Sequence, residues 1–291
     1  MKPPPFDYHA ARSVSEALEL LGRYAEDARL LAGGQSLVPM LNFRLATPRV
    51  LIDLNRVGEL AYIREENGWL RLGAMTRQRA IEFSPLVKER IPLLVEALGY
   101  VGHLPTRTRG TIGGSVAHAD PSAECPALLC ALGGELVIRG AGGERVVGAA
   151  DFFQDFFTTA LQPGELLVEV RLPVMPARSG WAFEEFARRH GDFAIVEVAA
   201  QVTLDERGGC RAARVAAAGV GATPLRLRAV EQIVERGGGA GAVVAQAAAR
   251  AAELVDPAGD HHASADYRRH LTEVLTRRAL SRAFAGVERS K

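Results

Sequence analysis

The spacing of hydrophobic and polar positions predicts short helices and strands in the N-terminal part of the chain. Ser13 and Glu16 have the spacing of a capping box, and apolar residues at helical spacing follow them, so we expect a helix over residues 14–25. Short apolar runs at 28–32 and 49–54 predict two buried strands of a small parallel sheet. Asn67 and Gly68, flanked by alternating residues, predict a hairpin with a type I′ turn.

The middle of the chain alternates between helical and strand-like patterns. A loop rich in glycine and arginine is expected at 102–115. Proline and glycine in 174–180 mark the best candidate for a domain boundary. The patterns predict helices at 76–83, 92–101 and 122–132, a hairpin at 135–147 and a strand at 165–173.

The last third of the chain predicts a small antiparallel sheet followed by helices. Gly208 and Gly209 predict the turn between two of its strands. Strands are expected at 182–188, 194–204 and 211–219, and helices at 225–235, 242–255 and 264–284. Together with the small parallel sheet near the N-terminus, these patterns predict an α+β fold class.

Composition and charge exclude several classes of function. The chain has 291 residues, and its net charge of +1 leaves no broad basic surface for nucleic acid or anionic membranes. It contains no apolar run long enough to cross a membrane, and its first residues lack the apolar core of a signal peptide. We therefore expect a cytoplasmic protein with no membrane span and no nucleic-acid partner.

The three cysteines do not point to a metal centre. They lack the spacing of a disulfide framework, a zinc site or an iron–sulfur cluster. Cys125 and Cys130 lie in a run rich in alanine and leucine, where we expect them to be buried as small hydrophobic residues. No metal ligand is predicted for this chain.

Two glycine pairs, each beside a hydroxyl residue, are the first candidates for chemistry. Gly33 and Gly34 precede Ser36, and a second pair, ending at Gly114, lies between Thr111 and Ser115. Glycine lets a backbone turn sharply and approach another group closely, and successive exposed N–H groups form an anion-binding nest. Each pair is equally consistent with a simple tight turn, and neither has the spacing of a P-loop or of a Rossmann fingerprint.

Two further groups of polar residues allow both a structural and a functional interpretation. Asp120 and Glu124 bracket a predicted helix start, where they would cap the helix or compensate its dipole, or hydrogen-bond to a ribose or a ring nitrogen. Arg189 and Asp192 lie at a break before an apolar strand, which is typical of a solvated turn. Alternatively, that break adjoins a flat ligand with Phe193 as its wall.

Taken together, these motifs resemble a known family. The chain resembles the FAD-binding medium subunit of molybdenum hydroxylases, a family that includes the flavoprotein subunits of carbon monoxide dehydrogenase and of xanthine dehydrogenase-like enzymes. Six segments match in the family's order and span nearly the whole chain: AGGQSLVPMLNFRLATP (32–48), LIDLNRVGEL (51–60), LGAMT (72–76), RGTIGGSVAHADPSAECPA (109–127), FARRHGDFAIVEVAA (186–200) and ASADYRRHLTEVLTRRAL (263–280).

The resemblance implies a fold in three parts. It implies a small parallel-sheet FAD-binding subdomain at 1–57 and a mixed α+β subdomain at 58–175. A C-terminal domain, with an antiparallel sheet and helices, is implied at 178–289. The cofactor would then lie between the two N-terminal subdomains and the C-terminal domain.

The resemblance also implies which residues bind FAD, the only cofactor expected. Residues 32–37 bind the pyrophosphate on one side, and the 111–115 loop with the helix after it binds it on the other. Glu124 lies near the ribose or adenine, and residues 189–193 lie beside the isoalloxazine. No catalytic nucleophile or base is expected. The implied residues are Ala32, Gly33, Gly34, Gln35, Ser36 and Leu37; Thr111, Gly114, Ser115 and Ala117; Asp120 and Glu124; and Arg189, Asp192 and Phe193.

The implied activity is that of a flavoprotein oxidoreductase subunit. Electrons would come from the [2Fe–2S] clusters of a small subunit, pass through FAD and leave to quinone, NAD or oxygen, while a large molybdopterin-binding subunit oxidises the substrate. The implied assembly is a heterohexamer, a dimer of heterotrimers. A stand-alone flavin oxidoreductase and a redox-inactive nucleotide-binding assembly module are the alternatives.

Overall fold

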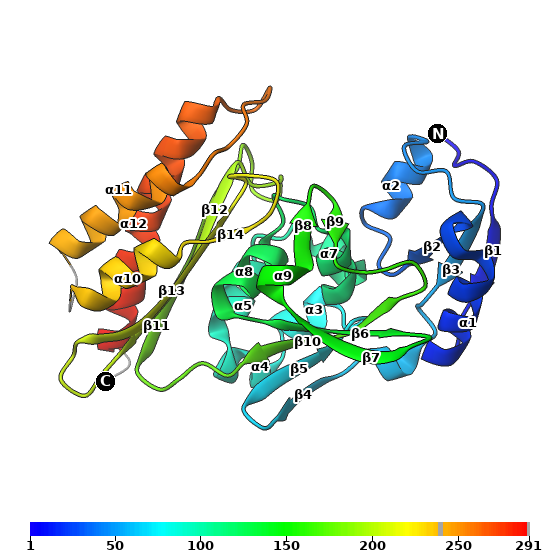
Figure 1. Cartoon of the computed structure of the whole chain (residues 1–291), viewed down its shortest axis with the longest axis horizontal. Coiled ribbons are helices and arrows are strands. Elements are labelled where there is room, and N and C mark those ends of the chain that lie inside the picture. The colour runs from blue at the N-terminus through cyan, green and yellow to red at the C-terminus, as the bar shows by residue number, and fades with distance from the viewer. Residues whose placement is uncertain (238–240, 290–291) are drawn as a thin grey trace.

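A computed structural model describes residues 1–237 and 241–289 and shows three principal sheets in a row, with helices around them (Figure 1). The N-terminal sheet is at the right of the view, the middle sheet is central, and the C-terminal sheet is at the left with its helices on the outside. This arrangement agrees with the predicted α+β class. No helix among the described residues is long and apolar enough to cross a membrane.

The N-terminal sheet is parallel, as the apolar runs predict. Its strands are β1 (Asp7–Ala10), β2 (Ala28–Leu31) and β3 (Val50–Asp53), in the order β1-β3-β2. Helix α1 (Val14–Tyr24) starts after Ser13, whose hydroxyl accepts the Glu16 N–H at 3.1 Å and confirms the predicted cap. The short helices η1 (Ala25–Asp27) and α2 (Leu37–Asn42) complete this part. The sequence pattern missed β1, a four-residue strand directly after a proline-rich start.

The middle sheet is antiparallel, with the order β4-β5-β10-β6-β7. Asn67 and Gly68 both have positive φ, at 51° and 78°, which confirms the predicted hairpin. The short helix η2 (Gly58–Leu60) leads into this sheet. The strands are β4 (Ile63–Glu66), β5 (Trp69–Gly73), β6 (Glu135–Gly140), β7 (Gly143–Gly148) and β10 (Leu166–Pro173), and β8 (Phe153–Asp155) and β9 (Thr158–Thr159) form a separate pair.

Helices cover the middle sheet and correct one prediction. The segment 102–115, predicted as a loop, contains a helix and most of a second one, because Thr111 caps the second helix and Gly113 packs where a Cβ would lie 2.5 Å from that of Ala74. Gly113 therefore permits close packing against Ala74 and does not indicate a flexible loop. The helices are α3 (Gln78–Glu82), α4 (Pro85–Arg90), α5 (Pro92–Leu98), α6 (Leu104–Arg109), α7 (Ile112–His118), α8 (Glu124–Leu132) and α9 (Ala149–Phe152).

The C-terminal sheet is antiparallel in the order β11-β12-β13-β14, and three helices follow it. The predicted start of a helix at 225 is wrong, since residues 225–226 form an edge strand and the helix begins at Arg228. The elements are β11 (Ser179–Phe186), β12 (Val196–Leu204), β13 (Cys210–Ala218), β14 (Leu225–Arg226), α10 (Arg228–Arg236), α11 (Ala242–Leu254) and α12 (Ala265–Arg289).

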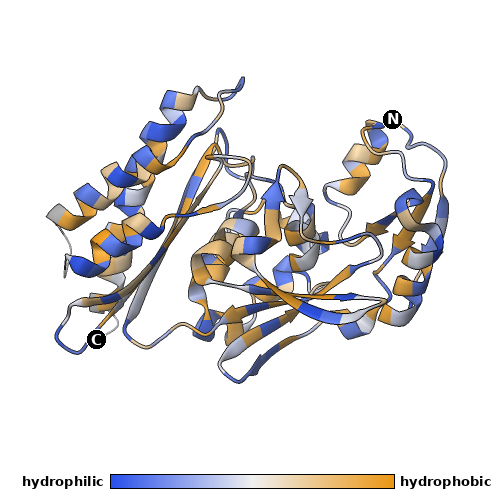
Figure 2. Cartoon of the chain, viewed as in Figure 1, coloured by the Kyte–Doolittle hydropathy of each residue, from blue (hydrophilic) through white to orange (hydrophobic). Residues whose placement is uncertain are grey.

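Both faces of the C-terminal sheet are covered. Helices α10 and α12 pack against one face, and α8 of the middle part packs against β12 and β13 on the other. Along β12, Val196 and Val198 belong to the core under the helices, while Ala199 belongs to the core shared with α8. Figure 2 shows the hydrophobic strands of this sheet and the polar positions along the helices outside it. The alternation also directs Glu197, on the same face as Ala199, toward α8.

Candidate functional site

The two glycine motifs, far apart in sequence, lie against each other. We call residues 32–37, which connect β2 to α2 and include the first residue of that helix, the first glycine loop, and residues 109–115 the second glycine loop. A Cβ on Gly33 would lie 2.5 Å from the Arg109 carbonyl oxygen and 2.8 Å from the Gly110 Cα. A Cβ on Gly114 would lie 3.3 Å from that of Ala32. The loops meet backbone to backbone, and only glycine at position 33 permits this approach.

The first glycine loop presents unused backbone donors. Gly34 has a φ of 75°, and the Gln35 side-chain amide donates to the Gly33 carbonyl at 3.1 Å. Within the described chain, the N–H groups of residues 33–36 donate to no protein acceptor. Ser36 precedes α2 without making a capping hydrogen bond, and Leu37 begins that helix. Successive free N–H groups around a positive-φ glycine fit the charged oxygens of a phosphate.

The second glycine loop differs, since the N–H groups of Gly110 and of residues 112–115 are already paired. Thr111 is 2% exposed, and its hydroxyl accepts the Gly114 N–H at 3.0 Å. The N–H groups of Ile112 and Gly113 donate to carbonyls of the segment after β5, at 3.1 and 2.9 Å. Ser115 and Ala117 follow on α7 and are half-buried. This loop therefore supports the first one and offers hydroxyl groups rather than a row of free amides.

A polar network that the sequence analysis missed bridges the two loops. The Asn55 side chain donates to the Ala32 carbonyl at 3.0 Å and accepts from Arg77 at 2.5 Å. Arg77 also donates to the Arg109 carbonyl, so one Asn–Arg pair holds both loops. The Asp53 carboxylate in turn accepts a hydrogen bond from the Asn55 backbone N–H at 2.8 Å, which fixes the position of Asn55. The position of Asn55 in the sequence could have identified it. Asn55 directly follows β3 and the first glycine loop directly follows β2, and because these strands are parallel, their carboxyl ends lie at the same edge of the sheet.

A cavity of about 420 Å³ lies beside this network. Asn55, Thr76 and Arg77 are among its lining residues. Burial, followed by the charge of Arg109, lowers the pKa of Arg77. The guanidinium nevertheless remains charged at neutral pH, because its ordinary pKa lies far above that range.

Asp120 shapes a turn rather than capping the following helix. Its carboxylate accepts the Ser122 N–H at 2.9 Å, while α8 begins after Ala123, which offers no capping side chain. This bond is typical of an Asx-turn. The capping role that the sequence suggested for Asp120 is therefore wrong.

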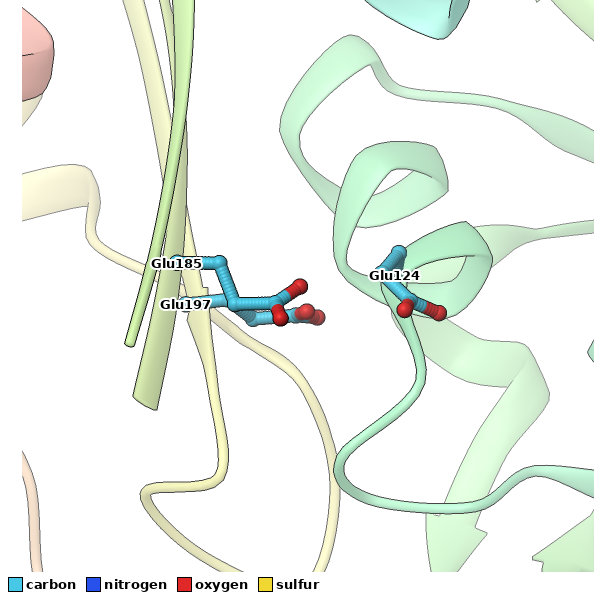
Figure 3. A group of neighbouring side chains, drawn as sticks. All are labelled: Glu124, Glu185 and Glu197. Carbon is cyan, nitrogen blue, oxygen red and sulfur yellow. The ribbon is translucent and has the colours of Figure 1, made fainter. Parts of the chain in front are cut away.

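Glu124 is buried among other acids. It is 6% exposed, and Glu185 and Glu197 each bring a carboxylate oxygen within 4.8 Å of one of its own (Figure 3). Burial raises the pKa of Glu124 to about 7 and that of Glu185 to about 8, and burial followed by the Glu124 charge raises the pKa of Glu197 strongly. Nothing local in the sequence pairs Glu124 with residues 61 and 73 positions later.

The third candidate segment lies beside the helix that leads into the second glycine loop. Arg189, Asp192 and Phe193 are exposed, and Phe193 is 65% exposed. Gly191 has a φ of 87°, and a Cβ there would lie 2.6 Å from the His103 ring. The turn between β11 and β12 thus packs against the start of α6, which leaves the Phe193 ring free to contact a ligand or partner.

The cysteines are free and buried. Cys125, Cys130 and Cys210 form no disulfide. Burial raises the pKa of Cys125 and of Cys130 to about 12, which keeps both thiols protonated and unreactive. The prediction of small buried residues for these two positions is confirmed.

Comparison with known proteins places the chain in a family. Residues 4–175 match the FAD binding domain in molybdopterin dehydrogenase, and residues 181–283 match the CO dehydrogenase flavoprotein C-terminal domain. The chain is 43% identical to the 6-hydroxypseudooxynicotine dehydrogenase complex subunit alpha of Paenarthrobacter nicotinovorans, over 98% of this chain and 96% of that protein. It is 40% identical to the carbon monoxide dehydrogenase medium chain of Hydrogenophaga pseudoflava, over 98% and 99% of the two chains.

A solved structure agrees with the sequence comparison. A chain of carbon monoxide dehydrogenase from Hydrogenophaga pseudoflava superposes with a TM-score of 0.95 at 41% identity, covering 98% of this chain and 99% of that one. Both family domains occur in the order expected from the resemblance, and FAD is the cofactor of the first. The chain belongs to the FAD-binding flavoprotein family of the molybdopterin dehydrogenases, which includes the medium chains of carbon monoxide dehydrogenase.

Proposed function

We propose that this chain is the electron-transfer subunit of a molybdenum hydroxylase complex, in which it carries FAD. Two of its relatives are named as a dehydrogenase complex subunit and a dehydrogenase medium chain, which supports a role within an assembly. The observation that carries the proposal is the first glycine loop, with four unused N–H groups against a second loop. This geometry fits a pyrophosphate without any positively charged side chain.

We propose specific roles for the residues of the site. The backbone of Ala32–Leu37 binds the pyrophosphate, and Thr111, Gly114, Ser115 and Ala117 complete that pocket. Asp120 and Glu124 lie toward the ribose or adenine side, and Arg189, Asp192 and Phe193 lie toward the flavin ring. The support is the contact between the two loops and the packing of the 188–193 turn against α6.

The chain's own contribution is positioning. FAD, when bound, supplies the chemistry, because a flavin exchanges either one or two electrons. The free N–H groups bind and orient the cofactor phosphates, and the Asn55–Arg77 pair holds the two loops at the spacing that this requires.

The proposed partners are a small subunit with [2Fe–2S] clusters and a large molybdopterin-binding subunit, in a dimer of heterotrimers. The small subunit delivers electrons, which then leave to quinone, NAD or oxygen. We propose the domain limits 1–57, 58–175 and 178–289, supported by a separate sheet in each part. A cytoplasmic location is proposed as well, and the free cysteines suit a reducing compartment.

The proposal is tested on the purified chain and on the assembled complex. The chain should bind stoichiometric FAD, followed by visible flavin absorbance during titration with added cofactor. In stopped-flow experiments, substrate should reduce that flavin only when the partner subunits are present. Reduction by substrate in the isolated chain would instead favour a stand-alone flavin oxidoreductase. FAD binding without reduction in the complex would favour a redox-inactive assembly module.

A further inference from the structure

Three buried carboxylates meet between the middle part of the chain and the C-terminal sheet. Glu185 on β11 and Glu197 on β12 project toward the start of α8, where Glu124 lies (Figure 3). One oxygen from each lies within 4.8 Å of the other two. Glu185 and Glu197 are also direct cross-strand partners in the antiparallel register, and like charges in such a pair repel each other.

The cluster has no unpaired counter-charge among the residues that the structure describes. Glu197 is 0% exposed, and neither of its carboxylate oxygens has a hydrogen-bond partner. The Glu185 Oε2 is likewise buried and unpartnered. Arg107 favours the charged form of Glu124, but its guanidinium is already paired with Glu82 at 3.0 Å. A buried, unpaired carboxylate is costly, so this arrangement needs a compensating ligand.

The donor set and its dimensions suit a hard cation. Carboxylate oxygens are the preferred ligands of calcium, magnesium and manganese. Oxygens on opposite sides of a calcium ion, each at about 2.3–2.6 Å, lie about 4.6–5.2 Å apart. Three oxygens within 4.8 Å of one another therefore fit in one coordination shell. Glu185 as a residue is half-buried, so this side of the cluster is not fully enclosed by protein.

We propose that Glu124, Glu185 and Glu197 bind one hard divalent cation between α8 and the C-terminal sheet. Each ligand comes from a different element, so the ion would link the middle part of the chain to its C-terminal part. This cation site shares Glu124 with the residues that we propose on the ribose or adenine side of FAD. Glu185 and Glu197 have no proposed role in FAD binding, so the two proposals can be tested separately. The same acids would otherwise have to hold protons and hydrogen-bond to one another, and the test below separates the two cases.

Manganese is the probe for this site, because its binding is seen directly. The full-length chain, freed of metal with a chelator and retaining its FAD, is titrated with Mn²⁺ near neutral pH while electron paramagnetic resonance reports the free ion. We expect one saturable site per chain, with calcium competing for it. Glu197→Gln keeps the shape of the side chain but removes its charge, and should weaken binding at least about tenfold, since affinity depends on the number of charged ligands.

A matched control makes the experiment decisive. Glu206→Gln makes the same change on an exposed turn and should leave Mn²⁺ binding unchanged. Glu185→Gln is the second test variant, and flavin absorbance of every variant reports folding and FAD binding separately from the metal. Equal affinities in the wild-type chain and both test variants would overturn the proposal. No saturable binding below about 1 mM, the weak end of protein calcium sites, would overturn it as well.

Discussion

Replacing Gly33 with alanine should weaken FAD binding while leaving the chain folded. The backbone at Gly33 lies outside the positive-φ region, so alanine is permitted by conformation and only the added Cβ matters. That Cβ would lie 2.5 Å from the Arg109 carbonyl oxygen and 2.8 Å from the Gly110 Cα. Both obstacles are backbone atoms, which cannot rotate away as a flexible side chain can. The two glycine loops must therefore separate.

The size of the effect follows from the cost of overpacking. Inserting a methyl group into a tightly packed contact costs about 1–3 kcal/mol. If the variant relieves the clash by separating the loops in the absence of FAD, FAD binding must bring them together again, and the whole packing cost is then subtracted from the free energy of FAD binding. At about 1.4 kcal/mol for each factor of ten, the dissociation constant for FAD should rise about 5- to 150-fold.

The assay is a titration of the apo chain with FAD, followed by flavin absorbance and fluorescence. Gly22→Ala is the matched control, since a Cβ at that position on α1 meets nothing within 4 Å. Circular dichroism of both variants checks that the fold is kept. If Gly33→Ala binds FAD within a factor of two of the Gly22→Ala control, the proposed role of the first glycine loop is wrong.

Three further predictions concern side chains that the structure shows to be engaged. Asn55→Ala removes the bridge between the glycine loops and should weaken FAD binding about tenfold, as measured by the same titration. Arg268→Met leaves one buried and one part-buried backbone carbonyl without this donor and should lower the free energy of unfolding in urea by about 2–4 kcal/mol. Glu169 is 2% exposed; burial raises its pKa, but hydrogen bonds from Arg71, Tyr62 and a second arginine outweigh burial and lower it overall. Because the Glu169 pKa is lower in the folded than in the unfolded chain, the charged carboxylate stabilises the fold at neutral pH, and this stabilisation is lost as the pH falls. The thermal unfolding midpoints of Glu169→Gln and the wild type should therefore converge below about pH 4.

Each of these predictions has its own contrary outcome. Unchanged FAD affinity in Asn55→Ala would mean that the loops hold their spacing without the bridge. Arg269→Met is the control for Arg268, because among the described residues Arg269 pairs with two exposed acids. Its loss should cost less than about 0.5 kcal/mol. Equal losses in the free energy of unfolding for Arg268→Met and Arg269→Met would show that burial of Arg268 does not increase its contribution to stability. A gap between Glu169→Gln and the wild type that stays constant from neutral to acid pH would show that the charge at that position does not stabilise the fold.

Many elements of the fold could be predicted because their signals are local. Ser13 caps α1, and Asn67 with Gly68 turns a hairpin, in both cases through hydrogen bonds or backbone angles within a few residues. The predictions failed where tertiary packing overrode the local signal. Glycines in 109–115 suggested a loop, yet close contact with Ala74 makes glycine the residue that lets α7 pack there.

The candidate site divides in the same way. The sequence alone identified both glycine pairs, the third segment at Arg189, Asp192 and Phe193, and the family. It could not identify Asn55 or Arg77, because their role exists only where the ends of two parallel strands and a distant loop come together. An asparagine after a strand is common, and its role here depends on the hydrogen bond that its side chain donates to the distant Ala32 carbonyl.

By itself, the sequence determined most of the short segments that form helices and strands, where glycine pairs lie beside hydroxyl residues, and which family the chain resembles. These properties depend on neighbouring residues, through periodicity, capping and backbone freedom. The tertiary structure alone decided that the two glycine loops touch, that the Asn55–Arg77 pair holds both, and that Glu124 faces Glu185 and Glu197. Such proximities depend on how layers pack across long stretches of chain, and burial then changes the chemistry of groups whose sequence context is ordinary.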